Sequence, residues 1–142
     1  MLEISFHELN SVSESELKFA VIMSRYKRKW IFVKHKERET WEIPGGHKEV
    51  NEKIETAASR ELIEETGAND FSIFPLCIYS VDSGKNKTFG QLYYSEIKTL
   101  GELPNHEIVE IGLYDVIPEN LTYPMIQPYL FEKVQELILD FE

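Results

Sequence analysis

The chain has 142 residues, of which 42% are hydrophobic and 28% charged, a composition typical of folded globular proteins and not of disordered ones. Its 25 acidic and 15 basic residues leave a net charge of −10, which disfavours strong binding to nucleic acid or to an anionic membrane. The length suits one domain, so we expect a single domain over residues 1–142 that could bind metal cations.

Two further features concern the compartment. No apolar run approaches the roughly 18 residues that cross a bilayer, and the N-terminus lacks the basic and apolar regions of a secretion signal. The single cysteine, Cys77, cannot form a disulfide within the chain, which suits a reducing environment. We therefore expect a cytoplasmic protein without a membrane segment, either a monomer or a homodimer.

The N-terminal third predicts strands. Apolar and polar residues alternate over 2–9, and the apolar runs 18–25 and 30–36 flank a polar turn, which predicts a strand followed by a hairpin. A short extended segment, 41–43, then meets the Pro-Gly-Gly sequence at 44–46, which we expect to be a turn that ends any strand.

A helix is predicted next. Asn51 is a favourable N-cap residue and Gly67 is a favourable residue just past a helix C-terminus. Together they predict a helix over 52–66.

The C-terminal half predicts a second hairpin, over 71–81 and 88–97, followed by a strand over 107–116. A closing amphipathic helix is indicated by apolar residues that recur at helical spacing. These are Leu130, Val134, Leu137, Ile138 and Phe141. The order of elements predicts an α/β fold, with helices packed on the faces of a mixed β-sheet.

One face of the first predicted helix is apolar at its start and acidic toward its end. At 100° per residue, Glu61 and Glu65 continue the stripe that Ile54 and Ala58 begin, and Glu64 borders it. A solvated acidic face would need the acids opposite the apolar stripe. Charges about 5 Å apart repel by roughly 3 kcal/mol per pair at an effective dielectric constant of about 20. The stripe therefore predicts bound divalent cations such as Mg²⁺ or Mn²⁺, which prefer oxygen ligands.

The spacing around this helix resembles a known family signature. The chain reads Gly46, five residues, Glu52, seven residues, and then Arg-Glu-Leu-x-Glu-Glu-x-Gly-Ala over 60–68. This resembles the box of the Nudix hydrolases, Gx₅Ex₇REUxEExGU, in which U is a bulky aliphatic residue. Ala68, a small residue in the last U position, is the one departure. The resemblance implies a Nudix-type α/β/α sandwich, in which the box helix and the C-terminal helix pack on a mixed sheet.

The resemblance also implies a reaction. Nudix enzymes use Mg²⁺ or Mn²⁺ to hydrolyse a nucleoside diphosphate linked to another moiety, with water attacking a phosphorus atom. It implies that Glu64 and Glu65 bind metal, and that Glu61 is either a further ligand or the general base. Arg60 could pair with Glu64 or with Glu52 and orient these carboxylates.

Two more metal ligands are expected outside the helix. By resemblance, the backbone carbonyl of Gly45 is one. Family members often add an acid from a later loop, for which we choose Glu107 over Glu110.

The substrate is less constrained. The short chain and the closing segment 113–121 resemble bacterial nucleoside-triphosphate pyrophosphohydrolases, including those that remove oxidised guanine nucleotides. We expect a (d)NTP to be cleaved to the monophosphate and pyrophosphate, with 8-oxo-dGTP as a candidate. One alternative is an RNA 5′ end or another nucleotide conjugate, which the negative charge disfavours. A catalytically silent nucleotide-binding regulator is the other, and the complete set of acids disfavours it.

Substrate contacts are expected from two groups of residues. Lys34 and Lys36, on one face of their strand, and Arg38 in the following loop could hold the phosphates, although solvated lysines are the common case. Phe89 and Tyr93 could form a slot for the base, although both could equally pack in the core. His35 and His47 lie near the motif, but lone histidines are usually structural or solvated, and we do not expect either to be catalytic.

Overall fold

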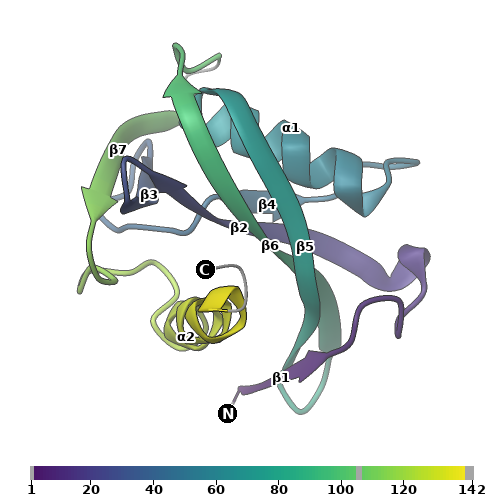
Figure 1. The fold of residues 1–142 in the computed structure, drawn as a ribbon. Coiled ribbons are helices and arrows are strands. Elements are labelled where there is room, and N and C mark those ends of the chain that lie inside the picture. Colours follow the sequence, from purple (N-terminus) through teal and green to yellow (C-terminus); the bar gives the residue numbers. More distant parts are fainter. Residues whose placement is uncertain (1, 105–106, 140–142) are drawn as a thin grey trace.

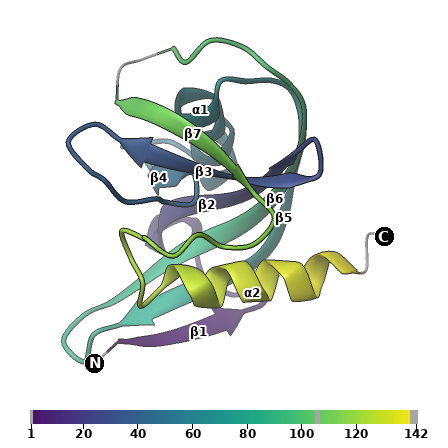
Figure 2. The same ribbon diagram turned by 90° about the vertical axis from the view of Figure 1, so that its left-hand side faces the viewer.

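A computed structural model describes residues 2–104 and 107–139, and its centre is a seven-stranded mixed sheet (Figure 1). The strand order is β1-β5-β6-β2-β3-β7, and β4 lies beside β2. The strands are β1 (Glu3–His7), β2 (Leu17–Tyr26), β3 (Lys29–His35), β4 (Gly45–His47), β5 (Ala68–Asp82), β6 (Lys87–Leu100) and β7 (Ile108–Tyr114). The helices are α1 (Ile54–Thr66), α2 (Gln127–Ile138) and the 3-10 turn η1 (Glu14–Glu16). The expected α/β sandwich is confirmed, with α1 and α2 on opposite sides of the sheet (Figures 1 and 2).

The strand pairing opens a gap beside β2. Strands β5 and β6 form a long antiparallel hairpin, and β6 runs parallel to β2. Strands β2 and β3 pair only next to their turn, at Arg25–Trp30 and Tyr26–Lys29. Beyond that point β2 pairs with β4 while β3 pairs with β7, so the sheet divides there.

The expected turn at 44–46 is wrong in part, because Gly45–His47 forms strand β4, antiparallel to β2. A side chain on Gly45 would collide with the backbone oxygen of Ala20. The glycine therefore permits a close approach between two strands, a role that the Pro-Gly-Gly sequence alone does not distinguish from a turn.

The prediction for α1 is confirmed at its C-terminus and wrong at its N-terminus. Gly67 ends the helix as expected, with φ of 75° and its N–H donating to the carbonyl of Ile63 at 2.9 Å. Asn51 is not the N-cap, because the helix begins at Ile54 and Asn51 has φ of 65° in the preceding loop. Instead, the carboxylate of Glu14, from η1, accepts the N–H of Ile54 at 3.1 Å.

Two apolar cores flank the sheet. On one side α1 buries Ile54, Ala57, Ala58 and Leu62. On the other side α2 buries Leu130, Phe131, Val134 and Ile138. The apolar stripe predicted for α2 is thus confirmed for its buried members, while Leu137 is partly buried and Phe141 lies outside the described residues. Within the described part of the chain, neither helix is long and apolar enough to span a membrane.

Candidate active site

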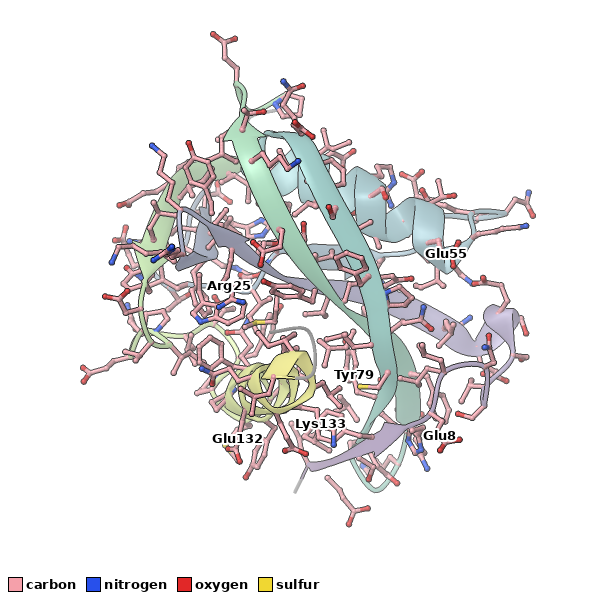
Figure 3. All side chains as sticks on the ribbon, viewed as in Figure 1. Glu8, Arg25, Glu55, Tyr79, Glu132 and Lys133 are labelled. Carbon is pink, nitrogen blue, oxygen red and sulfur yellow. The ribbon has the colours of Figure 1, made fainter. Side chains whose placement is uncertain are left out.

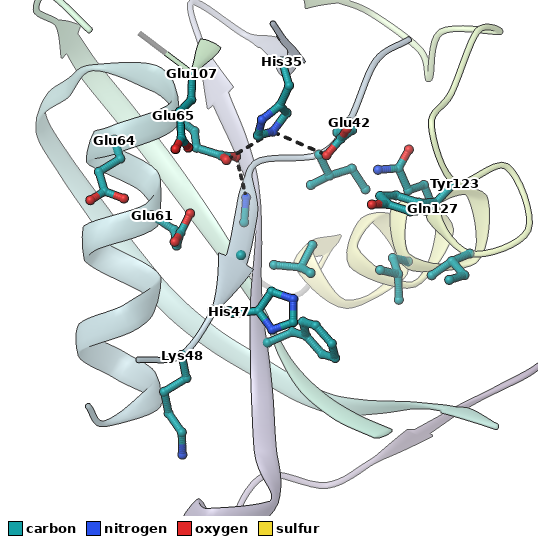
Figure 4. Close-up of a pocket in the computed structure, with 18 of the residues that line it drawn as sticks. His35, Glu42, His47, Lys48, Glu61, Glu64, Glu65, Glu107, Tyr123 and Gln127 are labelled. Atoms are coloured by element: carbon teal, nitrogen blue, oxygen red, sulfur yellow. Dashed lines mark hydrogen bonds and ion pairs between the residues drawn. The ribbon is translucent and has the colours of Figure 1, made fainter. Parts of the chain in front are cut away.

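A cavity of about 1190 Å³ lies where the sheet divides (Figure 4). Its lining is contributed by β2, β4, α1, the ends of β5 and β6, the segment 35–43, Glu107 and the segment 123–130. The cavity therefore joins the acidic face of α1 to the start of α2.

The cavity is acidic. Its described lining residues include seven acids and four lysines or arginines. The acids are Glu37, Glu42, Glu49, Glu61, Glu64, Glu65 and Glu107, and the bases are Lys36, Arg38, Lys48 and Arg60. An excess of carboxylates facing one space favours cations there, and an anionic ligand would need cations to accompany it.

The acids of α1 face this cavity as the helical geometry predicts. The side chain of Glu65 is 8% exposed, that of Glu61 12% and that of Glu64 37%. The exposed fraction is thus small for Glu65 and Glu61, which lie on the stripe, and larger for Glu64, which borders it. Glu55 is exposed and lies away from the cavity (Figure 3).

Arg60 is the hub of the charged network. Both pairings that the sequence allows for it occur: it bonds both carboxylate oxygens of Glu52, at 2.8 and 2.9 Å, and Glu64 at 3.0 Å. It also donates to Glu61 at 2.8 Å and to the backbone carbonyl of His47 at 3.1 Å. The Arg60 contact lowers the pKa of Glu52 to about 2. One cation is thus shared by three carboxylates.

The environment of Glu61 and Glu65 disfavours their charge. Burial, and then the charge of Glu65, raise the pKa of Glu61 to about 7, although Arg60 opposes the shift. Burial also raises the pKa of Glu65, against the opposing effects of His35 and of the Gly45 N–H. A divalent cation would relieve this repulsion, because carboxylate oxygens are its preferred ligands.

The donors fit such an ion in kind, but they are not gathered around a single point. Among the described residues, no three histidine, cysteine, aspartate or glutamate side chains stand close enough to hold a metal as they lie. Arg60 bonds Glu61 and Glu64, and Glu65 faces His35. Metal binding at Glu65 would therefore require the side chains of Glu61 and Glu64 to rotate toward it.

Strand β4 lies against the acids. The N–H of Gly45 donates to Glu65 at 3.0 Å, and a Cβ on Gly46 would lie 2.5 Å from a carboxylate oxygen of Glu61. Gly45 lines the cavity, which is compatible with its expected role. That its carbonyl binds a metal stays a prediction.

The later-loop acids lie apart. Glu107 precedes β7 and lines the cavity, where its carbonyl accepts the N–H of Lys36 at 2.8 Å. Glu110 is outside the lining and pairs with Lys34 at 3.6 Å. The placement of Glu107 suits a metal ligand, and that role also stays a prediction.

The structure separates the two lysines that alternation placed on one face. Lys36 and Arg38 line the cavity, whereas the ammonium of Lys34 lies 4.5 Å from the ring centre of Trp41, outside the lining. The pairing of β3 with β7 shifts register between Lys34 and His35, which breaks the alternation.

Neither aromatic residue expected at the base slot lines the cavity. Tyr93 is 2% exposed and packs in the core beneath α1, where its hydroxyl accepts a hydrogen bond from Gln91 at 2.8 Å. Phe89 packs against the same core, 5.8 Å from the ring of His7. The spacing showed which strand face they share, but not which side of the sheet that face covers.

His35 and Glu42 join the site although the sequence did not single them out for it (Figure 4). The Nε2 atom of His35 lies 3.2 Å from Glu65 and 3.4 Å from Glu42. The hydrogen bond to Glu65 is the main reason that the pKa of His35 is raised. Glu42 also accepts a hydrogen bond from Arg38 at 2.7 Å.

The start of α2 and the segment just before it contribute two more residues. Tyr123 lines the cavity together with Arg38, and its side chain contributes to raising the pKa of Arg38. Gln127 is 5% exposed, and its Oε1 accepts no hydrogen bond from any described residue. A sequence signal existed for Gln127, since it continues the buried stripe of Leu130 and Val134, one turn earlier.

The comparisons with known proteins agree with this geometry. Residues 15–118 match the family model of the NUDIX domain. YtkD of Bacillus subtilis (strain 168), provisionally named an 8-oxo-dGTP diphosphatase, is 33% identical over 102 residues, which are 71% of this chain and 64% of that protein. A second protein of that organism, also provisionally named an 8-oxo-dGTP diphosphatase, is 41% identical over 49 residues, 34% of this chain and 33% of its own. The chain thus spans less than two thirds of the length of either relative.

Solved structures show the same fold. The Bacillus subtilis pyrophosphohydrolase BsRppH (E68A mutant) superposes with a TM-score of 0.76 at 27% identity, over 95% of this chain and 90% of that one. A UDP-X diphosphatase superposes with a TM-score of 0.73 at 18% identity, over 94% and 68% of the two chains. With the family model matching most of its length and Glu61, Glu64 and Glu65 of the box lining one cavity, this chain belongs to the Nudix family.

Proposed function

We propose that the protein is a pyrophosphohydrolase that uses Mg²⁺ or Mn²⁺ to hydrolyse a nucleoside triphosphate to the monophosphate and pyrophosphate. The observation that carries this proposal is the face of α1 on which Glu61, Glu64 and Glu65 meet one large cavity. The family membership and the names of the relatives support the same class of reaction.

The residues divide the chemical work. Glu61, Glu64 and Glu65, with the Gly45 carbonyl and Glu107, would hold the metal. A divalent ion held by these residues would neutralise phosphate charge and lower the pKa of the attacking water. The oxygen of water attacks one phosphorus of the α–β anhydride, the bond from that phosphorus to the bridging oxygen breaks, and the monophosphate and pyrophosphate separate.

Two roles remain open for Glu61, as ligand or as the base that accepts the proton of the attacking water. Arg60 holds Glu61 and Glu64 in reach of the cavity, and its bonds to Glu52 fix the guanidinium itself. Lys36 and Arg38 line the same cavity and could bind the outer phosphates.

We place the base at the α2 end of the cavity. Tyr79, Val81, Ile126 and Leu130 supply apolar surface there, and Gln127 supplies a buried amide without a partner for its Oε1. An unpaired buried polar group is costly, so a ligand that pairs with it gains affinity.

The chemistry of an amide favours one kind of base edge. Guanine presents two acceptors, N7 and O6, whereas an amide offers one donor and one acceptor side by side. Oxidation of guanine at C8 places a hydrogen on N7, and the edge then offers a donor next to an acceptor. This match, with the names of the two Bacillus relatives, makes 8-oxo-dGTP the first candidate substrate.

A substrate panel tests the proposal. We expect pyrophosphate, not orthophosphate, to be released from 8-oxo-dGTP with Mg²⁺ or Mn²⁺, and no turnover in excess chelator. Unmodified dGTP, ATP, a UDP-sugar and a 5′-triphosphorylated RNA complete the panel. Orthophosphate as the first product, or turnover in chelator with no metal present, would contradict the proposed reaction. Preferred cleavage of the RNA would favour the alternative substrate.

The amide is tested separately. Gln127→Leu should lower kcat/KM for 8-oxo-dGTP by a factor of about ten to a hundred, the range of a lost two-point base contact, and affect ATP much less. Gln135→Leu is the matched control, because Gln135 is exposed on the same helix. Equal losses for both nucleotides would mean that Gln127 does not read the base.

A further inference from the structure

Glu42 is a buried acid outside the box, and its backbone fixes its position. The Glu42 N–H donates to the carbonyl of Val33 at 2.9 Å, and its carbonyl accepts the N–H of Val33 at 2.9 Å. These two hydrogen bonds therefore tie Glu42 to β3. Glu42 is 9% exposed and stands in the chain between the buried residues Trp41 and Ile43.

Both oxygens of the Glu42 carboxylate face cations or donors. One oxygen accepts from Nη1 of Arg38 at 2.7 Å, and the other lies 3.4 Å from Nε2 of His35. The same nitrogen of His35 lies 3.2 Å from Glu65 (Figure 4). The imidazole thus stands between two buried carboxylates, one anchored to the sheet and the other on α1.

Glu65 is held at both of its oxygens. Gly45 N–H donates to Oε1 at 3.0 Å, and His35 faces Oε2. A carboxylate has about four lone-pair positions, so these two contacts fix its orientation and leave others for a metal. Partners that orient a metal ligand in this way typically change metal affinity or activity 10- to 100-fold when they are mutated.

We propose that Glu42 and His35 are positioning residues: Glu42, anchored to β3, holds the imidazole of His35 against Glu65 and so sets the orientation of Glu65 for binding a divalent metal. The inference rests on the proposed function, since it takes Glu65 to be a metal ligand.

Calorimetric titration of the nucleotide-free protein with Mn²⁺ tests this directly. Glu42→Gln, which keeps the shape of the side chain, and His35→Ala should each weaken Mn²⁺ binding by about 10- to 100-fold. The double variant should bind no more weakly than His35→Ala alone, because Glu42 acts through His35. His35→Gln, which keeps an N–H donor, should recover part of the affinity.

Glu110→Gln is the matched control. Glu110 pairs with Lys34, the neighbour of His35 on β3, and does not line the cavity. This variant should bind Mn²⁺ like the parent protein. Turnover of Glu42→Gln and His35→Gln should rise toward the parent level as metal is raised.

The outcomes separate the inference from the proposed function. Parental Mn²⁺ affinity in both Glu42→Gln and His35→Ala, or additive losses in the double variant, would overturn the positioning role. If Glu64→Gln and Glu65→Gln also bound Mn²⁺ like the parent, the proposed metal site itself would fail. If those two lost Mn²⁺ while the Glu42 and His35 variants kept it, only the positioning role would fail.

Discussion

The guanidinium of Arg60 holds the acids of the box together. It bonds Glu52 at both oxygens and also bonds Glu61 and Glu64, so most of its donors are committed to carboxylates. A side chain that is always charged and presents donors in a planar fork suits this role, which lysine could not fill. Arg60 is therefore both a structural link between the loop and α1 and a support for the site.

Glu52 gives this link a pH dependence. The Arg60 contact lowers the pKa of Glu52 from the ordinary 4.5 to about 2. As the pH falls through this interval, the unfolded chain takes up the proton first, so the free energy of unfolding decreases. We expect Glu52→Gln to be less stable than the parent at neutral pH, and the difference to disappear near pH 2. Urea unfolding of the metal-free proteins over a pH series measures this.

Glu49→Gln is the control, because Glu49 is 69% exposed and lies 3.8 Å from Arg60. It should match the parent closely at every pH, as exposed pairs contribute little. A Glu52 variant as stable as the parent at neutral pH would show that the pairing with Arg60 contributes nothing to folding.

Helix α1 depends on a cap from a distant part of the chain. Glu14, on η1, accepts the N–H of Ile54 and also pairs with Lys48 at 3.0 Å. Loss of a capping side chain typically costs about 1 kcal/mol. We expect Glu14→Ala to lower Tm by about 2–4 °C, and Glu14→Gln, which keeps an acceptor, to lower it less.

The control for the cap is Glu16→Ala, in the same 3-10 turn and exposed. Its Tm should be within a degree or so of the parent value, as is usual for surface substitutions. Equal losses at both positions would place the effect in η1 and not in the cap.

The two glycines of β4 should respond differently to an added methyl group. At Gly46 the methyl would meet the end of the Glu61 side chain, which can move, so the fold should persist while kcat falls by at least about tenfold. At Gly45 it would meet backbone of β2, which cannot yield easily, and unfolding should become easier by roughly 1–3 kcal/mol. Thermal unfolding and turnover of Gly46→Ala and Gly45→Ala separate the two effects. Parental activity in Gly46→Ala would contradict the close packing of β4 on Glu61.

For the whole molecule, local patterns predicted most of the elements and the acidic face of α1. Period-two and helical patterns depend on neighbouring residues, and so does the cap at Gly67, so these features could be predicted from the sequence. The box spacing also predicted which acids share a face, and Glu61 and Glu65 are the most buried of them.

The features that could not be predicted depend on contacts between distant parts of the chain. The cap of α1 comes from Glu14, 40 residues before Ile54. Whether Lys34 faces the cavity depends on a register shift against β7. The contact of His35 with Glu65 and the place of Gln127 in the cavity lining follow from packing of the sheet, the box helix and α2 around one cavity. Sequence spacing carries no information on such packing.

The central claim is that Glu61, Glu64 and Glu65 act as one metal-binding unit on a phosphoanhydride. The most direct measurement is kcat/KM for the parent, the three single Gln variants, the double Glu64→Gln/Glu65→Gln and Glu55→Gln, whose side chain lies away from the cavity. Each single change in the unit should cost about 10²-fold or more, roughly 3 kcal/mol of transition-state stabilisation.

The double variant decides the matter. Its loss should be clearly smaller than the product of the two single losses, because the second change meets a site that is already broken. Glu55→Gln should stay within about threefold of the parent. Losses that multiply in the double variant, or a Glu55→Gln variant as impaired as Glu64→Gln, would contradict the account of this acidic face as a single metal site.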